Sequence, residues 1–370
     1  MADPVHSGAA LRVGFDATPL LGARTGVGTY VQNLCTILAR RDDLCLRAVA
    51  FSLRGRAALA ALPNEVRVMH RPVPGRLLRR AWLRCDVPPA EWLTGRVDVV
   101  HGTNFVLPPP RSARGVVTVH DLAFLHYPEL VDAASLAYRT LVPRAVARAA
   151  VVVTVSQAMA EEISTAYRVP PERLAVTEIG VHQSWFEPAP RVPGVPGDYI
   201  LAVGTLEPRK GLDVLVAAYR DLLAADPSAP SLVLVGPPGW GASLDLSGIP
   251  SGRVVLPGYA DAQTLRGLMQ HARLLAFPTR YEGFGLPPLE ALAAGTAVVA
   301  SDLPVVREVV GPHARLVPVG DVAALAAAIS ATLAEDRPAD AVAAARAHAA
   351  TFTWERCAAK TVAAYHRAAR

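Results

Sequence analysis

Short apolar runs alternate with longer stretches of helical spacing along most of the chain. Runs of about four to eight apolar residues predict buried strands, and apolar residues that recur every three or four positions predict helices. In the first half, the runs that predict strands are 11–15, 46–51, 97–101, 116–120 and 151–156. A helix is expected from about 28 to 40. Strands alternating with helices are typical of a parallel sheet covered on both faces.

A proline-rich stretch, FEPAPRVPGVPGD at 186–198, interrupts this pattern. Because proline fixes φ and has no backbone donor, we predict a linker between two domains, 1–185 and 199–351. After it, the pattern predicts strands at 199–203, 231–235, 253–256, 274–277 and 297–300, and helices at 212–225, 323–334 and 341–350. The last segment, 352–370, is expected to form a helix that packs back on the first domain.

Both halves open in the same way, with an apolar strand, a glycine-containing loop and a helix. This recurrence predicts two Rossmann-like, doubly wound α/β domains that face a central cleft. In such sheets, ligands bind beyond the carboxyl ends of the strands. Two such edges facing one cleft would supply the two adjacent sites that a transferase needs.

Composition narrows the class of protein. The chain has 370 residues, of which 52% are hydrophobic, which is enough to bury two cores. The net charge of +5 favours anionic partners, such as a nucleotide diphosphate or a membrane surface. Nucleic acid is not expected, because no basic stripe is interleaved with aromatic residues. Four scattered cysteines without a CxxC pair indicate reduced thiols, and the absence of a signal peptide or long apolar span indicates a cytoplasmic protein.

The sharpest motif is YEGFGLPPLE at 281–290, with two glutamates, Glu282 and Glu290. The two prolines suit the first turn of a helix, so a helix is expected from about Pro287 to Ala294. Backbone amides from Gly283 to Leu286 would then meet an anion at the start of that helix. Glu282 is predicted to bind a sugar hydroxyl, and Glu290, in the first turn, to accept from both ribose hydroxyls. The alternative for Glu290 is an acid that only complements the helix dipole.

A second motif, GTLEPRKG at 204–211, directly follows the opening strand of the second half. Arg209 supplies a planar fork of donors and Lys210 a point charge, which together suit a diphosphate leaving group. The alternative is a solvated basic loop.

The first half carries weaker signals. The loop TGVGTY at 25–30 contains GxG, but Val31 stands where a dinucleotide-binding fingerprint has its third glycine, which counts against NAD. His120 ends a predicted strand, where an imidazole can hydrogen-bond a sugar. Acceptor contacts are predicted for residues at or just beyond strand ends, namely Asp16, Asn104 and Asp121.

Two further observations concern metal and membrane. No aspartates are spaced as Asp-x-Asp and no His/Cys cluster has metal spacing, so we expect no metal requirement, with Arg209, Lys210 and a helix N-terminus in place of the cation. The basic amphipathic segment 76–84 is consistent with peripheral contact at the inner face of the plasma membrane. Its alternative is an exposed helix near the acceptor.

Together these residues resemble the retaining GT-B glycosyltransferases of family 4, over nearly the whole chain. The matching pieces are Asp16, the TGVGTY loop, DVVHGTN at 98–104, His120-Asp121, GTLEPRKG, Gly258-Tyr259, Phe277-Pro278, EGFGLPPLE and GTAVVAS at 295–301. The resemblance implies that His120, Arg209, Lys210 and Glu282 serve catalysis. It implies donor contacts at Gly28, Gly204, Thr205, Arg209, Lys210, Tyr259, Glu282, Gly283, Phe284, Gly285, Leu286 and Glu290.

The resemblance also implies the reaction. Glu282 would lie near the C3 hydroxyl of the donor sugar, and transfer would proceed on the front face, with the leaving phosphate oxygen taking the acceptor proton. The segment FPTRYEGFGLPPLE at 277–290 is most similar to the mannosyltransferase branch of the family. This similarity implies GDP-mannose as the donor and a saccharide or glycolipid as the acceptor. A UDP-sugar donor, a sugar-nucleotide epimerase or phosphorylase, and a non-catalytic binding subunit are the alternatives.

Overall fold

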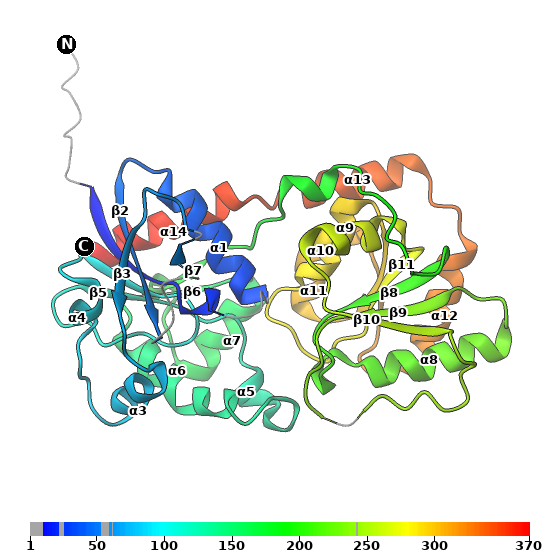
Figure 1. The fold of residues 1–370 in the computed structure, drawn as a ribbon, viewed down its shortest axis with the longest axis horizontal. Coiled ribbons are helices and arrows are strands. Elements are labelled where there is room, and N and C mark those ends of the chain that lie inside the picture. Colours follow the sequence, from blue (N-terminus) through cyan, green and yellow to red (C-terminus); the bar gives the residue numbers. More distant parts are fainter. Residues whose placement is uncertain (1–9, 22–25, 53–58, 61, 242) are drawn as a thin grey trace, which may run out of the picture. The chain divides into compact units, whose positions relative to one another are not determined.

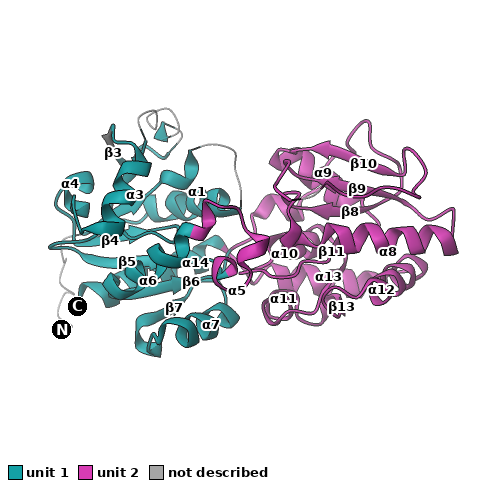
Figure 2. Cartoon of the chain, turned by 90° about the horizontal axis from the view of Figure 1, so that it is seen from below, with its two compact units in different colours: residues 1–122, 137–179, 354–370 teal, residues 123–136, 180–353 magenta. Residues whose placement is uncertain are grey.

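The computed structural model describes residues 10–21, 26–52, 59–60, 62–241 and 243–370. The chain forms two compact units (Figure 2). The first contains Met1–Leu122, Ala137–Ile179 and Trp354–Arg370, and the second contains Ala123–Leu136 and Gly180–Thr353. Each unit therefore takes in at least one segment from the other half of the sequence.

The first unit is built on a seven-stranded parallel sheet of order β3-β2-β1-β4-β5-β6-β7 (Figure 1). Its strands are β1 Leu11–Asp16, β2 Leu44–Phe51, β3 Arg67–Arg71, β4 Val99–Gly102, β5 Arg114–Thr118, β6 Val151–Thr154 and β7 Leu174–Val176. The five predicted strands are present with shifted ends, and β3 and β7 were not predicted. His120 lies beyond the end of β5, so its predicted place within a strand is wrong.

The second unit is built on a six-stranded parallel sheet of order β10-β9-β8-β11-β12-β13. Its strands are β8 Tyr199–Val203, β9 Ser231–Val235, β10 Val254–Gly258, β11 Leu274–Phe277, β12 Ala297–Ser301 and β13 Arg315–Val317. The predictions for β8, β9 and β11 agree with the structure at both ends, whereas β13 was not predicted.

The helices follow the strands as a doubly wound fold requires. In the first unit they are α1 Gly26–Ala39, α3 Gly75–Arg84, α4 Ala90–Thr94, α6 Tyr138–Arg148, α7 Gln157–Tyr167 and α14 Trp354–Ala369. In the second unit they are α5 Ala123–His126, α8 Leu212–Ala225, α9 Ala262–His271, α10 Leu286–Ala294, α11 Pro304–Val310, α12 Val322–Ala334 and α13 Ala339–Ala349. No helix within the described ranges is both long and apolar enough to cross a bilayer.

The core of the second unit explains its apolar strands. Ile200 and Ala202 of β8 share one apolar cluster with residues of α8 and α12. The intervening Leu201 points to the other face of the sheet and is fully buried as well. Because both faces are covered, the strand needs apolar residues at every position, which is the pattern that predicts it.

The C-terminal helix α14 completes the core of the first unit. It packs against α1, β5 and β6. The Tyr365 hydroxyl lies 2.7 Å from Nδ1 of His101 on β4, and the Cys357 thiol donates to the Thr177 carbonyl at 3.8 Å. The last residues of the chain therefore stabilise a sheet built from its first half.

Candidate active site

The strongest polar cluster of the second unit lies where β8 and β11 end. These strands are neighbours in the sheet, so their carboxyl ends bring the loops 204–211 and 278–285 together. Gly211, which has φ +64°, closes the first loop, and a Cβ there would collide with the Pro278 carbonyl oxygen of the second. The two loops are thus in contact through their backbones.

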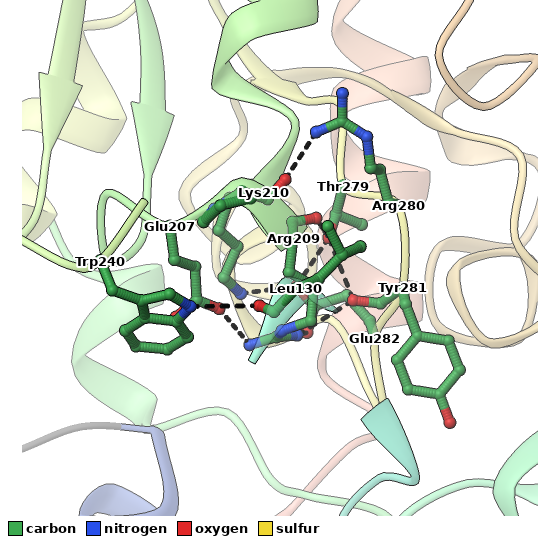
Figure 3. A network of polar contacts seen from close by, with 10 residues as sticks. Leu130, Glu207, Arg209, Lys210, Trp240, Thr279, Arg280, Tyr281 and Glu282 are labelled. Atoms are coloured by element: carbon green, nitrogen blue, oxygen red, sulfur yellow. Dashed lines mark hydrogen bonds and ion pairs between the residues drawn. The ribbon is translucent and has the colours of Figure 1, made fainter. Parts of the chain in front are cut away.

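Arg209 and Lys210 occupy a short 3-10 turn, Pro208–Lys210, between β8 and α8. Lys210 Nζ lies 2.5 Å from Glu282 Oε1, and Arg209 Nη1 lies 3.3 Å from Glu282 Oε2. Arg209 Nη2 lies 2.6 Å from Oε1 of Glu207 (Figure 3). Two cations and two carboxylates therefore form one largely buried ionic cluster.

Backbone contacts fix Arg209 in this cluster. Its Nη1 donates to the Tyr281 carbonyl at 3.0 Å, and its own carbonyl accepts from the Arg280 amide at 2.8 Å. The Thr279 hydroxyl lies 3.1 Å from Glu282 Oε1. Arg280 in turn pairs with Asp213 at 2.7 Å on the exposed side. The guanidinium is consequently oriented by the loop after β11 as well as by its own turn.

The two glutamates respond differently to these surroundings. Burial alone would raise the pKa of Glu282, but attraction by Lys210 and Arg209 outweighs burial and lowers it. For Glu207, burial dominates and raises the pKa, although Arg209 and Lys210 oppose it. Glu207 was not among the predicted site residues. Its signal was present in the sequence, since it stands in the same EPRK motif.

Helix α10 begins beside this cluster. Gly285, with φ +97°, is its N-terminal cap, and the two prolines lie in the first turn. Glu290 is correspondingly in the second turn, so its predicted place in the first turn is wrong, and the helix-dipole alternative loses its basis. Burial raises the pKa of Glu290 to about 8, and no described side chain forms an ion pair with it. A half-buried carboxyl with a raised pKa and no described ionic partner suits a ligand that bears hydroxyl groups.

Other predicted donor residues lie at the same edge of the second sheet. Gly204 and Thr205 directly follow β8, and Tyr259 directly follows β10, where its side chain is 54% exposed. Gly283 and Phe284 are buried in the loop before α10, and the Phe284 ring lies 6.1 Å from that of Phe352.

A segment from the first half of the sequence, 123–136, lies against Tyr281, in the loop 278–285, and against Trp240. The Tyr127 ring is 5.3 Å from the Tyr281 ring, and Trp240 Nε1 donates to the Leu130 carbonyl at 3.2 Å. Sequence reasoning missed this contact, because nothing in an apolar pattern assigns a short segment to a distant sheet.

The predicted residues of the first unit also gather at one edge, since β1, β4 and β5 are neighbours. The Thr103 hydroxyl donates to the Asp16 carbonyl at 2.6 Å, and His120 Nε2 lies 2.8 Å from the Thr103 carbonyl. Because a carbonyl only accepts, Nε2 carries the proton of a ring whose pKa is lowered by burial. Burial also raises the pKa of Asp16 to about 6.

Three further predicted residues differ in their setting. Oδ1 of Asn104 is buried without a partner among the described residues, next to Phe105, whose φ is +62°. Asp121 follows His120 and is half-buried. Gly28 lies in the first turn of α1, which begins at Gly26 and not near residue 28 as predicted. Thr25, from the predicted loop, lies outside the described residues.

Within the described ranges, no group of three or more His, Cys, Asp or Glu could hold a metal ion.

Known proteins are similar to this chain in sequence and in fold. Residues 197–335 match the family model for glycosyl transferases group 1, and residues 24–185 match that for glycosyltransferase family 4. The O-antigen chain mannosyltransferase B of Escherichia coli is 32% identical over 282 residues, covering 72% of this chain and 74% of that protein.

Solved structures of other proteins have the same fold. Sucrose-phosphate synthase from Thermosynechococcus elongatus superimposes with a TM-score of 0.73 at 20% identity, covering 96% of this chain and 98% of the other. Anabaena Alr3699/HepE in complex with UDP-glucose gives 0.68 at 19% identity, with coverage of 95% and 99%. Two parallel-sheet α/β units of this kind define a GT-B fold, and the protein is a glycosyltransferase. The chain belongs to glycosyltransferase family 4.

Proposed function

We propose that the protein is a retaining, metal-independent hexosyltransferase that moves mannose from GDP-mannose to a saccharide or glycolipid hydroxyl with an α linkage. The observation that carries the proposal is the buried pair Arg209–Lys210 beside Glu282. The mannose donor is supported by the name of the Escherichia coli relative, which assigns mannose transfer to that protein.

In the proposed reaction, Arg209 and Lys210 bind the donor diphosphate and stabilise the negative charge that develops on it. The bond between the anomeric carbon and the phosphate oxygen breaks, and a bond to the acceptor oxygen forms on the same face. The acceptor proton passes to the departing phosphate oxygen. Glu282 positions the donor sugar, and the backbone amides at the start of α10 bind phosphate.

The remaining predicted residues receive roles in the same scheme. Glu290 would accept from the ribose hydroxyls, since no charged group among the described residues pairs with its carboxyl. His120 would contact the sugar, and Asp16, Asn104 and Asp121 the acceptor. Gly28, Gly204, Thr205, Tyr259 and the loop residues Gly283, Phe284, Gly285 and Leu286 would line the donor.

A screen of sugar nucleotides for slow hydrolysis tests the proposal without knowledge of the acceptor. GDP-mannose should be hydrolysed, and Lys210→Ala should abolish this activity. The matched control is Lys360→Ala, because Lys360 is the only other lysine in the chain and pairs with Glu178 in the first unit. If Lys210→Ala hydrolyses the donor as fast as the control, the assignment of the diphosphate site fails.

A UDP-sugar is the second candidate donor. Its support is the fold-level similarity to a protein solved with UDP-glucose. Titration calorimetry with GDP and with UDP distinguishes the two donors: tighter binding of UDP would replace mannose transfer by transfer from a UDP-sugar.

Peripheral membrane contact is part of the proposal. Helix α3 exposes four arginines and Leu77, which is 57% exposed, and contains no acidic residue. Leu78 and Trp82 on its other face are buried and pack in one cluster of the first unit. Such a face suits anionic lipid. Vesicles with phosphatidylglycerol should pull the protein down and vesicles of pure phosphatidylcholine should not; equal recovery would refute the contact.

A further inference from the structure

The cation pair at the donor site is already neutralised by the protein itself. Glu207 and Glu282 supply two negative charges to the two positive charges of Arg209 and Lys210. All four side chains are at most 16% exposed. A diphosphate that enters this site therefore meets a neutral cluster and must compete with a carboxylate for the same donors.

The two carboxylates are held in different ways. Glu207 belongs to the turn that carries the cations: its amide donates to the Thr205 carbonyl at 2.8 Å, and its carbonyl accepts from the Lys210 amide at 3.0 Å. Its side chain is 4% exposed. A side chain enclosed to this degree has little room to rotate away from Arg209.

Glu282 belongs to a different loop and is held to the cations by its side chain. Its carboxylate contacts Lys210, Arg209 and the Thr279 hydroxyl, and it is more exposed than Glu207, at 11%. Rotation of this side chain releases Lys210 and leaves Arg209 paired with Glu207, without moving the turn on which both cations lie.

We propose that the two glutamates have opposite roles: Glu207 is a permanent counter-ion that positions Arg209, and Glu282 is an exchangeable one that the donor diphosphate displaces. The inference rests on the proposed function. Displacement couples the two parts of the donor, because Glu282 becomes available to the sugar only after the diphosphate has taken its place on Lys210. In the donor-free protein, the self-occupied state lowers the apparent affinity for any diphosphate.

Titration calorimetry with GDP and UDP, on variants in which one glutamate is replaced by glutamine, tests this division of roles between Glu207 and Glu282. Glu282→Gln removes the competitor and should tighten nucleoside diphosphate binding by roughly tenfold. Glu207→Gln releases Arg209 from its position and should weaken binding by roughly tenfold. Simple long-range electrostatics predicts that both variants bind more tightly, since each removes one negative charge beside an anion site. The opposite signs are therefore the diagnostic result.

Two further variants serve as controls. Asp213→Asn removes a carboxylate that pairs with Arg280 and does not touch the cation pair, so it should change the affinity less than about twofold. Glu207→Asp keeps the charge but is too short to preserve the 2.6 Å contact with Arg209, and it should also weaken binding. It provides the test if Glu207→Gln does not fold.

The outcomes separate the inference from the proposed function. Weaker or unchanged binding by Glu282→Gln, or tighter binding by Glu207→Gln, would overturn the division of roles while leaving the diphosphate site in place. Absence of binding to wild type and every variant would overturn the proposed function and this inference together.

Discussion

Replacing Glu290 by glutamine should stabilise the donor-free protein while weakening its function. Burial raises the pKa of this carboxyl from its ordinary value of 4.5 to about 8, and no described cation pairs with it. Below about pH 4.5, the group is protonated in both the folded and the unfolded chain, so the variant and the wild type should be equally affected. Between about 4.5 and 8, the unfolded chain loses a proton that the folded chain retains, so the wild type loses stability as the pH rises.

The magnitude follows from the width of this pH window. Each pH unit within it corresponds to about 1.4 kcal/mol in the free energy of unfolding. The full interval would give several kcal/mol, but Glu290 is only half-buried, and solvent screening reduces the effect. We therefore expect Glu290→Gln to be about 2 kcal/mol more stable than wild type above pH 8, with the advantage disappearing towards pH 5.

Urea unfolding followed by circular dichroism, at about pH 5 and about pH 9, measures this difference directly. Above about pH 8, where the wild-type group is ionised, the same variant should also lose donor affinity, because glutamine is a weaker acceptor for ribose hydroxyls than a carboxylate. If Glu290→Gln is less stable than wild type at the higher pH, the carboxyl is satisfied in the folded state and the argument for an open ribose site fails.

Three other outcomes are expected. Gly211→Ala should cost more than about 2 kcal/mol in urea unfolding, because its Cβ meets the Pro278 carbonyl, whereas Gly320→Ala, with a positive φ but open space, should cost about 1 kcal/mol; equal costs would contradict the close approach. Tyr365→Phe should lower the free energy of unfolding by about 1–3 kcal/mol, since it leaves the buried His101 Nδ1 without its 2.7 Å partner; an unchanged midpoint would show that the bond is dispensable. Removal of divalent cations with a chelator should leave the transfer rate unchanged, and a rate restored by added magnesium would contradict metal independence.

The apolar pattern predicted the interior of both sheets better than their edges. Strands β8, β9 and β11 were predicted at both ends because each is continuously apolar and covered on both faces. The three strands that were missed, β3, β7 and β13, each lie at the edge of a sheet. Of these, β3 is mostly polar and β7 and β13 have three residues each, so all three lack the long apolar run that identifies the others. The fourth edge strand, β10, contains the run Val254–Leu256 and was predicted.

The sequence predicted most of the residues of the candidate site, but not how their side chains contact one another. Arg209, Lys210 and Glu282 were identified from two separate motifs. Lys210 and Glu282 are 72 residues apart in the sequence, and the pairing of β8 with β11 places them in contact. Glu207 was overlooked because its identity alone does not reveal that its side chain turns back onto Arg209. The helix was predicted to begin at about Pro287 and begins at Leu286, and this difference of one residue moves Glu290 from the first turn into the second.

Several features at the carboxyl ends of β8 and β11 in the second unit lower the stability of the fold. Glu290 is a half-buried carboxyl with no ionic partner in the part of the chain that the structure describes, and Gly211 places the chain in a conformation that few other residues adopt. The cluster around Arg209 keeps four ionisable groups from water, and buried ion pairs of this kind contribute little net stability compared with apolar packing. Core packing does not require any of them, since the apolar cluster around Ile200 lies on the sheet face and not at its carboxyl edge. Their concentration where two adjacent strands end is what a binding site for an anionic, hydroxyl-rich donor requires, because charges and acceptors that are fixed before the donor arrives need not be reorganised during the reaction.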